Sequence, residues 1–213
     1  PELYRLYTQG TYYISKNTKE DFSRALKCFN DAMAVDPADP LPYLGLALGY
    51  SNAGHSSPVA EDASNRAKSY ALKALELDST LADAHVVLAT RYLYTEWDFP
   101  KAEYHLRRAI ELNPNNPSAH YTYGWYYSLN NRIDEAISEI KRSVEIDPTD
   151  VTAQGYLAWI HFYFGNFEEA LEESRKLLQL DQNNSLAYYL MGSAYAEMGM
   201  NYEAIEMNTK GVS

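Results

Sequence analysis

Cysteine is almost absent from this chain, since Cys28 is the single thiol among 213 residues. It has no internal partner for a disulfide, and no set of Cys and His residues has the spacing of a zinc site. No apolar run approaches the roughly 18 residues of a membrane-spanning helix, and no basic stretch followed by an apolar one opens the chain. The sequence therefore predicts no disulfide, metal, membrane span or signal peptide, and we expect a cytoplasmic segment of a longer protein.

Basic residues are also scarce relative to acidic ones. There are 18 Lys and Arg against 29 Asp and Glu, which gives a net charge of −11. Because nucleic acids attract basic surfaces, this balance disfavours DNA or RNA as a partner. An acidic surface instead favours solubility and gives a mild preference for basic partners.

Catalytic motifs are missing as well. The sequence has no Gly-rich phosphate loop, no nucleophile elbow and no HExxH motif. The acidic pairs Glu168-Glu169 and Glu172-Glu173 are predicted to lie on a solvated helix face, and Cys28 is predicted to be a small buried hydrophobic residue. We expect no catalytic residue, no cofactor and no metal site, so the chain is predicted not to be an enzyme.

The most prominent pattern in the sequence is an internal repeat with a period of about 34 residues. A small residue recurs in the pattern E/K-x-A-x-x-x-apolar-x-x-A at Ala25, Ala67, Ala102, Ala136, Ala170 and Ala204, evenly spaced from the third member onward and more widely before it. A second series of small residues is Gly10, Ala47, Ala89, Gly124, Ala158 and Gly192. Three positions after each of these comes Tyr or, once, His161. Interlocked series with one period are typical of stacked repeat proteins.

Each repeat is predicted to contain two amphipathic helices, because its apolar residues recur at spacings of three and four. Asp39, Asn116, Asp150 and Asn184 are predicted helix caps. The predicted helices are 2–16, 20–35, 40–53, 59–77, 81–95, 99–112, 117–130, 133–146, 151–164, 167–180, 185–198 and 201–210. Extra residues in the first two repeats, at 16–18 and 53–62, are predicted to form surface loops between paired helices.

This pattern resembles the tetratricopeptide repeat over essentially the whole chain. Residues 117–150 fit best, through His120, Tyr123, Gly124, Tyr127, Ala136, Ile140, Ser143 and Pro148. The resemblance implies an all-α, right-handed superhelix of stacked antiparallel helix pairs, a solenoid of about twelve helices whose concave wall is lined by the first helix of each repeat. It implies a single array over 1–213, with repeats near 3–38, 40–79, 82–115, 117–150 and 151–184 and a partial one at 185–213. The five histidines, His55, His85, His105, His120 and His161, are then interpreted as packing residues.

The resemblance also implies a function, which is binding of a protein or peptide in the concave groove. Family positions that face the groove carry aromatic side chains in the later repeats: Tyr94, Tyr121, Trp125, Trp159, Phe162, Tyr163 and Tyr189. Because Tyr and Trp dominate binding hot spots, we expect an apolar, aromatic or basic partner segment there. The family's clamp for a C-terminal carboxylate is absent, since its sites are occupied by Tyr7, Thr11, Leu44 and Leu48.

Two alternatives remain open. In one, the groove is filled by the chain itself or by a second copy, so that the chain is a structural module or a homo-oligomer. In the other, the chain is a regulatory segment of a larger signalling protein. The segments Glu96–Pro114 and Glu2–Tyr13 resemble the repeat regions of bacterial multidomain proteins with nucleotide cyclase, Ser/Thr kinase or winged-helix effector domains.

Overall fold

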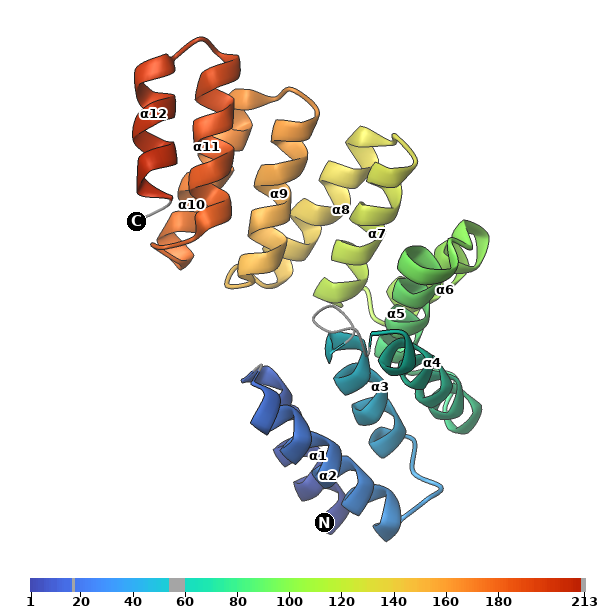
Figure 1. The fold of residues 1–213 in the computed structure, drawn as a ribbon. Helices are drawn as coiled ribbons and strands as arrows, with labels where there is room; N and C mark the ends of the chain where they lie inside the picture. Colours follow the sequence, from blue (N-terminus) through green and yellow to red (C-terminus); the bar gives the residue numbers. More distant parts are fainter. Residues whose placement is uncertain (17, 54–59, 212–213) are drawn as a thin grey trace. The chain divides into compact units, whose positions relative to one another are not determined.

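The computed structural model describes residues 1–16, 18–53 and 60–211, and the regular elements of this part of the chain are all helices. Twelve α-helices follow one another in these residues, and a short π-helix, η1, comes after the fifth. Consecutive helices pack as antiparallel pairs, α1 with α2, α3 with α4, and so on to α11 with α12 (Figure 1). The chain is therefore all-α and built of paired helices, as the sequence predicts.

The helices belong to two compact units. The first unit, Pro1–Asn116, contains α1 (Glu2–Ser15), α2 (Lys19–Val35), α3 (Leu41–Ala53), α4 (Ala60–Leu77), α5 (Ala82–Arg91), η1 (Tyr92–Glu96) and α6 (Phe99–Leu112). The second unit, Pro117–Ser213, contains α7 (Pro117–Leu129), α8 (Ile133–Ile146), α9 (Val151–Tyr163), α10 (Phe167–Leu180), α11 (Ser185–Glu197) and α12 (Asn201–Lys210). The division between the units falls where the sequence predicts its fourth repeat to begin.

The observed helix ends lie close to the predicted ones. The ranges 133–146 and 167–180 coincide with α8 and α10, and 117–130 exceeds α7 by one residue. Two of the predicted caps are confirmed: Asp150 accepts hydrogen bonds from the amides of Thr152 and Ala153, and Asn184 accepts one from Ala187. The predicted surface loops fall largely on positions 54–59 and on Asn17, which lie outside the described residues.

The small residues of the repeat allow the paired helices to approach closely. The six alanines of the first series are all buried: Ala25, Ala67, Ala102, Ala136, Ala170 and Ala204. At Gly124 the approach is close, because an added Cβ would collide with Ile140 and would lie 3.0 Å from the carbonyl oxygen of Ala136. Only glycine fits between α7 and α8 at this point.

An irregularity in the third repeat has a local explanation. The interval from Ala89 to Ala102 is one position longer than the corresponding interval from Gly124 to Ala136 in the fourth repeat. In the structure Tyr92–Glu96 form a π-helical turn, which Trp97 ends in the left-handed region with φ of 55°. A π-turn contains one residue more than an α-turn, so it absorbs the insertion. The next residue, Asp98, then caps α6 by accepting a hydrogen bond from the third residue of the helix at 3.2 Å.

The acidic pairs of α10 are only partly as predicted. Three of the four side chains are exposed, namely Glu168, Glu169 and Glu172. Glu173 is buried at 9% exposure, so the prediction of a solvated position is wrong there. Its Oε2 accepts a hydrogen bond from the Gln154 amide of α9 at 2.8 Å, and its Oε1 lies 3.0 Å from Nζ of Lys176. The polar Gln154 therefore holds a carboxylate inside the α9–α10 pair.

Two further features bear on the sequence predictions. The thiol of Cys28 is buried, which confirms its interpretation as a small core residue, and burial raises its pKa. Within residues 1–16, 18–53 and 60–211, no helix is both long enough and apolar enough to cross a membrane.

Candidate functional site

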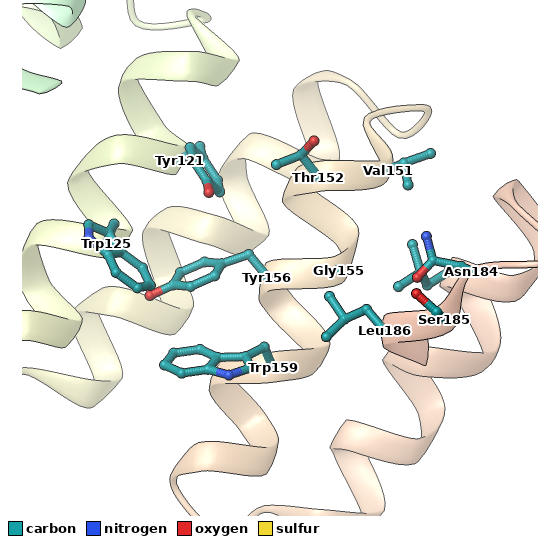
Figure 2. A pocket seen from close by; sticks show the side chains of 11 residues that line it. Tyr121, Trp125, Val151, Thr152, Gly155, Tyr156, Trp159, Asn184, Ser185 and Leu186 are labelled. Carbon is teal, nitrogen blue, oxygen red and sulfur yellow. The ribbon is translucent and has the colours of Figure 1, made fainter. Parts of the chain in front are cut away.

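The second unit contains a pocket between the first helices of its three repeats. Its cavity volume is about 590 Å³, within the range of small-molecule and side-chain binding sites. The lining residues come from α7, α9, α10 and α11 and from the residue that precedes α11: Tyr121, Trp125, Val151, Thr152, Gly155, Tyr156, Trp159, Leu177, Asn184, Ser185 and Leu186 (Figure 2). None of these side chains is charged, so the pocket is an apolar and aromatic hollow with a polar edge at Asn184 and Ser185.

Helix periodicity brings the aromatic rings together. Tyr121 and Trp125 are four residues apart and therefore lie on one face of α7. On α9, Thr152, Gly155 and Trp159 follow at spacings of three and four and form the facing wall. The two helices thus place the large rings of Tyr121, Trp125 and Trp159 around a hollow. The small side chains at Thr152 and Gly155 leave the space for it.

The rings are packed against one another in a defined order. Tyr156 and Trp159 are stacked, with centroids 5.3 Å apart and an interplanar angle of 17°. Tyr163 continues the stack on the other side of Trp159 at 5.0 Å and 16°. From α7, Trp125 lies 4.8 Å from the Tyr156 centroid, and Tyr121 meets Tyr156 edge to face at 5.5 Å. Such contacts stabilise the rings beyond the burial of their area, so they favour this arrangement of the wall.

A hydrogen bond fixes the central ring. The hydroxyl of Ser128 donates to the carbonyl oxygen of Trp125 at 2.8 Å and lies 2.8 Å from the hydroxyl of Tyr156. Since the single proton of Ser128 goes to the carbonyl, Tyr156 is the donor of the second bond. Burial raises the pKa of the Tyr156 phenol, so the ring stays neutral and remains a donor. Burial and then the Asp150 carboxylate raise the pKa of Tyr121 in the same way.

The floor and the edge of the pocket are set by residues with small or fixed side chains. Gly155 forms part of the floor, and a Cβ there would lie 3.3 Å from Cδ2 of Leu186. At the edge, Asn184 caps α11 through its oxygen, and its amide donates to Asp181 at 3.1 Å. The edge is therefore held in place by the helix start itself.

The structure places the predicted groove residues in several different settings. Three of them line the pocket: Tyr121, Trp125 and Trp159. Tyr163 extends the ring stack and is 64% exposed, and Tyr189 is 59% exposed on α11. Phe162 packs instead beside Phe167 and against the cluster formed by Leu171, Met191 and Ala194. Tyr94 belongs to η1 of the first unit and is half-buried.

Several residues that shape the pocket are absent from the predicted set. These are Tyr156, Gly155 and Leu186, of which the first two precede the predicted groove residues on α9. Tyr156 gives no signal as a groove residue in the sequence, because its phase along α9 is that of a core position. In the structure its side chain is 8% exposed. Gly155 does fall on a groove phase, and a glycine among large aromatic residues is the signal that could have indicated a hollow.

The described histidines take part in packing and hydrogen bonding. His85, His120 and His161 are buried, with 6%, 7% and 4% exposure. Nδ1 of His120 lies 2.6 Å from a carboxylate oxygen of Glu139, and Nδ1 of His85 lies 2.8 Å from Nδ1 of His105. His55 lies outside the described residues. Where the structure describes the chain, no three His, Cys, Asp or Glu residues gather as potential metal ligands.

Comparison with known proteins agrees with this architecture. A tetratricopeptide repeat family model matches residues 105–138, and a TPR repeat model matches residues 158–199. The chain is 25% identical over 137 residues to the transcriptional regulator HilA of Salmonella typhimurium and of Salmonella typhi. The match covers 63% of this chain but 24% of HilA, so the chain spans about a quarter of the length of these curated relatives.

Solved structures show the same fold. The APC/C hetero-tetramer Cut9–Hcn1 matches 99% of this chain and 40% of its own, with a TM-score of 0.81 and 15% identity. YrrB, described as a TPR protein with an unusual peptide-binding site, matches 86% of this chain and 90% of its own, with a TM-score of 0.62 and 24% identity. A thermophilic TPR protein of Thermus thermophilus, TTC0263, matches 91% of this chain and 99% of its own, with a TM-score of 0.72 and 20% identity.

Paired antiparallel helices, buried small residues that recur with the repeat and these likenesses define a helical-repeat protein, a class whose fold serves as a scaffold for binding other proteins. Within that class, the two family matches show tetratricopeptide repeats at residues 105–138 and 158–199.

Proposed function

We propose that this chain is a non-catalytic interaction module, and that its second unit binds a segment of a partner polypeptide in the aromatic pocket formed by α7, α9 and α11. The observation that carries the proposal is the hollow of about 590 Å³ whose walls are Tyr121, Trp125, Tyr156 and Trp159. Preformed pockets lined by rigid aromatic rings are where binding energy concentrates in protein interfaces.

The wider groove belongs to the same proposal. Tyr163 and Tyr189 expose large aromatic surfaces on α9 and α11, the two helices that form much of the pocket wall. We include them, with Phe162, as contacts of the bound segment outside the pocket, and Tyr94 stays a predicted contact of the first unit. YrrB, whose description names a peptide-binding site, provides support by fold likeness. The net charge of −11 favours a polypeptide over a nucleic acid as the partner.

The match to HilA favours a second candidate, which is compatible with the first. Because HilA is a transcriptional regulator of which this chain covers 24%, the chain is proposed to act as the docking segment of a larger regulatory protein. A groove filled by a second copy of the chain remains the competing explanation, and it predicts a dimer in solution.

The test is selection of peptides from a random display library on the immobilised chain, followed by titration of the selected peptides. Trp125→Ala and Trp159→Ala should each weaken binding at least tenfold, since hot-spot aromatic residues contribute about 2 kcal/mol or more. Tyr202→Ala is the matched control, because Tyr202 is 80% exposed on α12 and does not line the pocket. A failure to select any peptide, or equal binding by all three variants, would contradict the proposal.

Oligomeric state and stability distinguish a partner-binding groove from a groove that is filled by a second copy of the chain. If the groove binds a partner, light scattering should show that the chain is a monomer, and both Trp variants should stay folded. A groove occupied by a second copy predicts a dimer that dissociates when Trp125 or Trp159 is replaced.

A further inference from the structure

We propose that the aromatic pocket of the second unit takes the cationic side chain of an arginine, or less favourably a lysine, from a basic segment of the partner. This inference rests on the proposed function and gives the chemistry of the residue that enters the pocket. Three features support it: the ring–cation contacts that the chain itself makes, the charge of the second unit, and the geometry of the stacked rings.

The chain already uses tyrosine rings to hold cations. Nζ of Lys16 lies 4.5 Å from the ring centroid of Tyr12, and the guanidinium carbon of Arg132 lies 4.4 Å from that of Tyr127. Similar contacts join Lys68 to Tyr92 at 4.7 Å and Arg66 to Tyr50 at 5.6 Å. The negative face of an aromatic ring attracts a cation within about 6 Å, and tryptophan attracts it most strongly. The pocket gathers two tyrosine rings and two tryptophan rings around one hollow.

The charge of the second unit favours a positive occupant. Residues 117–213 contain six Lys and Arg against fourteen Asp and Glu, so the unit has a net charge of −8. The lining residues themselves are uncharged, and no basic side chain is among them to repel a cation. Asp150 lies at the start of α9, close enough to Tyr121 to affect its phenol electrostatically. A neutral, mostly apolar pocket in an acidic unit raises the local concentration of cations and favours their contact with the rings.

The geometry favours arginine in particular. Tyr156, Trp159 and Tyr163 form a column of nearly parallel rings, with interplanar angles of 17° and 16°. A planar guanidinium group can stack on a ring face that such a column leaves open, whereas an ammonium group cannot. The aliphatic stem of the same side chain would pack on Leu186 and Val151, which lie on the opposite side of the hollow in Figure 2.

The experiment uses two amides of the same shape that differ in charge. N-acetylarginine amide and its neutral analogue N-acetylcitrulline amide are titrated separately into the ¹⁵N-labelled chain, and the indole N–H signals are followed by NMR. We expect the arginine compound to shift the Trp125 and Trp159 signals and to bind about fivefold more tightly than the citrulline compound, the size of an ordinary cation–π contact. Added salt should reduce this preference, because part of it is long-range attraction to the acidic unit.

Substitutions test the role of the ring column. Trp159→Leu should remove the preference for arginine over citrulline, while Trp159→Phe, which keeps a ring, should retain a reduced one. Tyr202→Leu, outside the pocket on α12, should behave as the unmodified chain. If Trp159→Leu fails to fold, the comparison of Trp159→Phe with the unmodified chain still measures the contribution of the indole ring.

Several outcomes would overturn the inference. Equal binding of the two amides, or tighter binding of N-acetyltryptophan amide than of N-acetylarginine amide, would show that the pocket selects an apolar or aromatic group instead. The proposed function would then stand, provided that selected peptides still bind through Trp125 and Trp159. If neither the amides nor any selected peptide shifts the indole signals, the inference and the proposed function both fail.

Discussion

The Nδ1 atoms of His85 and His105 lie 2.8 Å apart, so one imidazole ring donates a hydrogen bond to the other across the α5–α6 pair. His85 also donates to the backbone carbonyl of Ser79. A neutral imidazole has a single N–H, so His105 must be the donor between the two rings. The pKa values of both rings lie below the ordinary value, so both rings are neutral near pH 7, and protonation of His85 would remove the acceptor of this bond.

Acid should destabilise the first unit through this pair. Burial and the neighbouring His85 lower the pKa of His105 to about 4, and burial followed by repulsion from Arg108 lowers that of His85. Since the unfolded chain binds protons near pH 6.5, the stability that the neutral pair contributes is full above that pH and is lost as the pH falls toward 4. The loss should be on the order of 2 kcal/mol.

The measurement is urea unfolding between pH 7.5 and 4, compared with the variant His85→Leu/His105→Leu. The difference in unfolding free energy between the two proteins should change with pH in this window, whereas carboxylate titration is common to both. A difference that stays constant from pH 7.5 to 4 would contradict the prediction. Tyr104→Phe is a suitable control, because Tyr104 is exposed and contacts the ring of His105.

Gly124→Ala should destabilise the second unit by about 1–3 kcal/mol, the usual cost of overpacking. The new methyl group would collide with Ile140 and would lie 2.9 Å from its Cδ1 atom. Replacing Ile140 by Ala removes the clash, so the two substitutions together should cost less than the sum of their separate effects. Denaturant unfolding measures the cycle, and Ser118→Ala, at an exposed position of α7, provides the control. If the effects of the two substitutions on the unfolding free energy simply add, the contact between position 124 and Ile140 is not the cause of the destabilisation.

Gln154→Leu should destabilise the α9–α10 pair by about 1–3 kcal/mol, because it leaves the buried carboxylate of Glu173 without its amide donor. The double variant Gln154→Leu/Glu173→Leu replaces both partners by apolar groups and should recover part of the loss. Glu172→Leu, at an exposed neighbouring position, should have little effect. Thermal unfolding of the four proteins checks the prediction, and a double variant less stable than Gln154→Leu would refute it.

Arg91→Ala should destabilise the junction of α4 and α5 by about 1–2 kcal/mol, because it removes several charge-assisted hydrogen bonds at once. The guanidinium group donates to Glu96 at 3.1 Å, to Ser64 at 2.5 Å and to Asn65 at 2.9 Å, and the side chain is 11% exposed. Arg107, which pairs with Glu103 on the exposed face of α6, provides a contrast. Its replacement by Ala should change stability little, as is usual for surface pairs. Equal effects of the two substitutions in urea unfolding would contradict this account.

The helices were predictable because their signals are local and repeated. Apolar spacing, capping residues such as Asp150 and the buried alanines recur from one repeat to the next, so each repeat supports the interpretation of the others. The exception, Glu173, shows the limit of that reasoning. Its burial depends on Gln154, which lies on the partner helix.

The candidate site was predictable only in part. Tyr121, Trp125 and Trp159, which the groove phases indicate, line the pocket, because these phases follow from helix geometry. The hollow itself depends on the small residue Gly155 and on the tilt of Tyr156, which its bond to Ser128 fixes. Gly155 falls on a groove phase and could have indicated the hollow, but the tilt of Tyr156 depends on a contact with another helix, which no pattern along one segment indicates. The roles in binding of all seven predicted groove residues stay predictions: Tyr94, Tyr121, Trp125, Trp159, Phe162, Tyr163 and Tyr189.

The π-helical turn at Tyr92–Glu96 has a consequence for how such chains tolerate changes in length. An insertion in the middle of a helix rotates every later side chain by about 100°, which would turn the core stripe toward water. Here the added residue is confined to one widened turn just before the helix ends, and Ala102 still reaches the buried position of its series. The end of the first helix in a repeat is therefore a place where residues can be gained without a shift in the phase of the second helix, and grafted segments are best placed there.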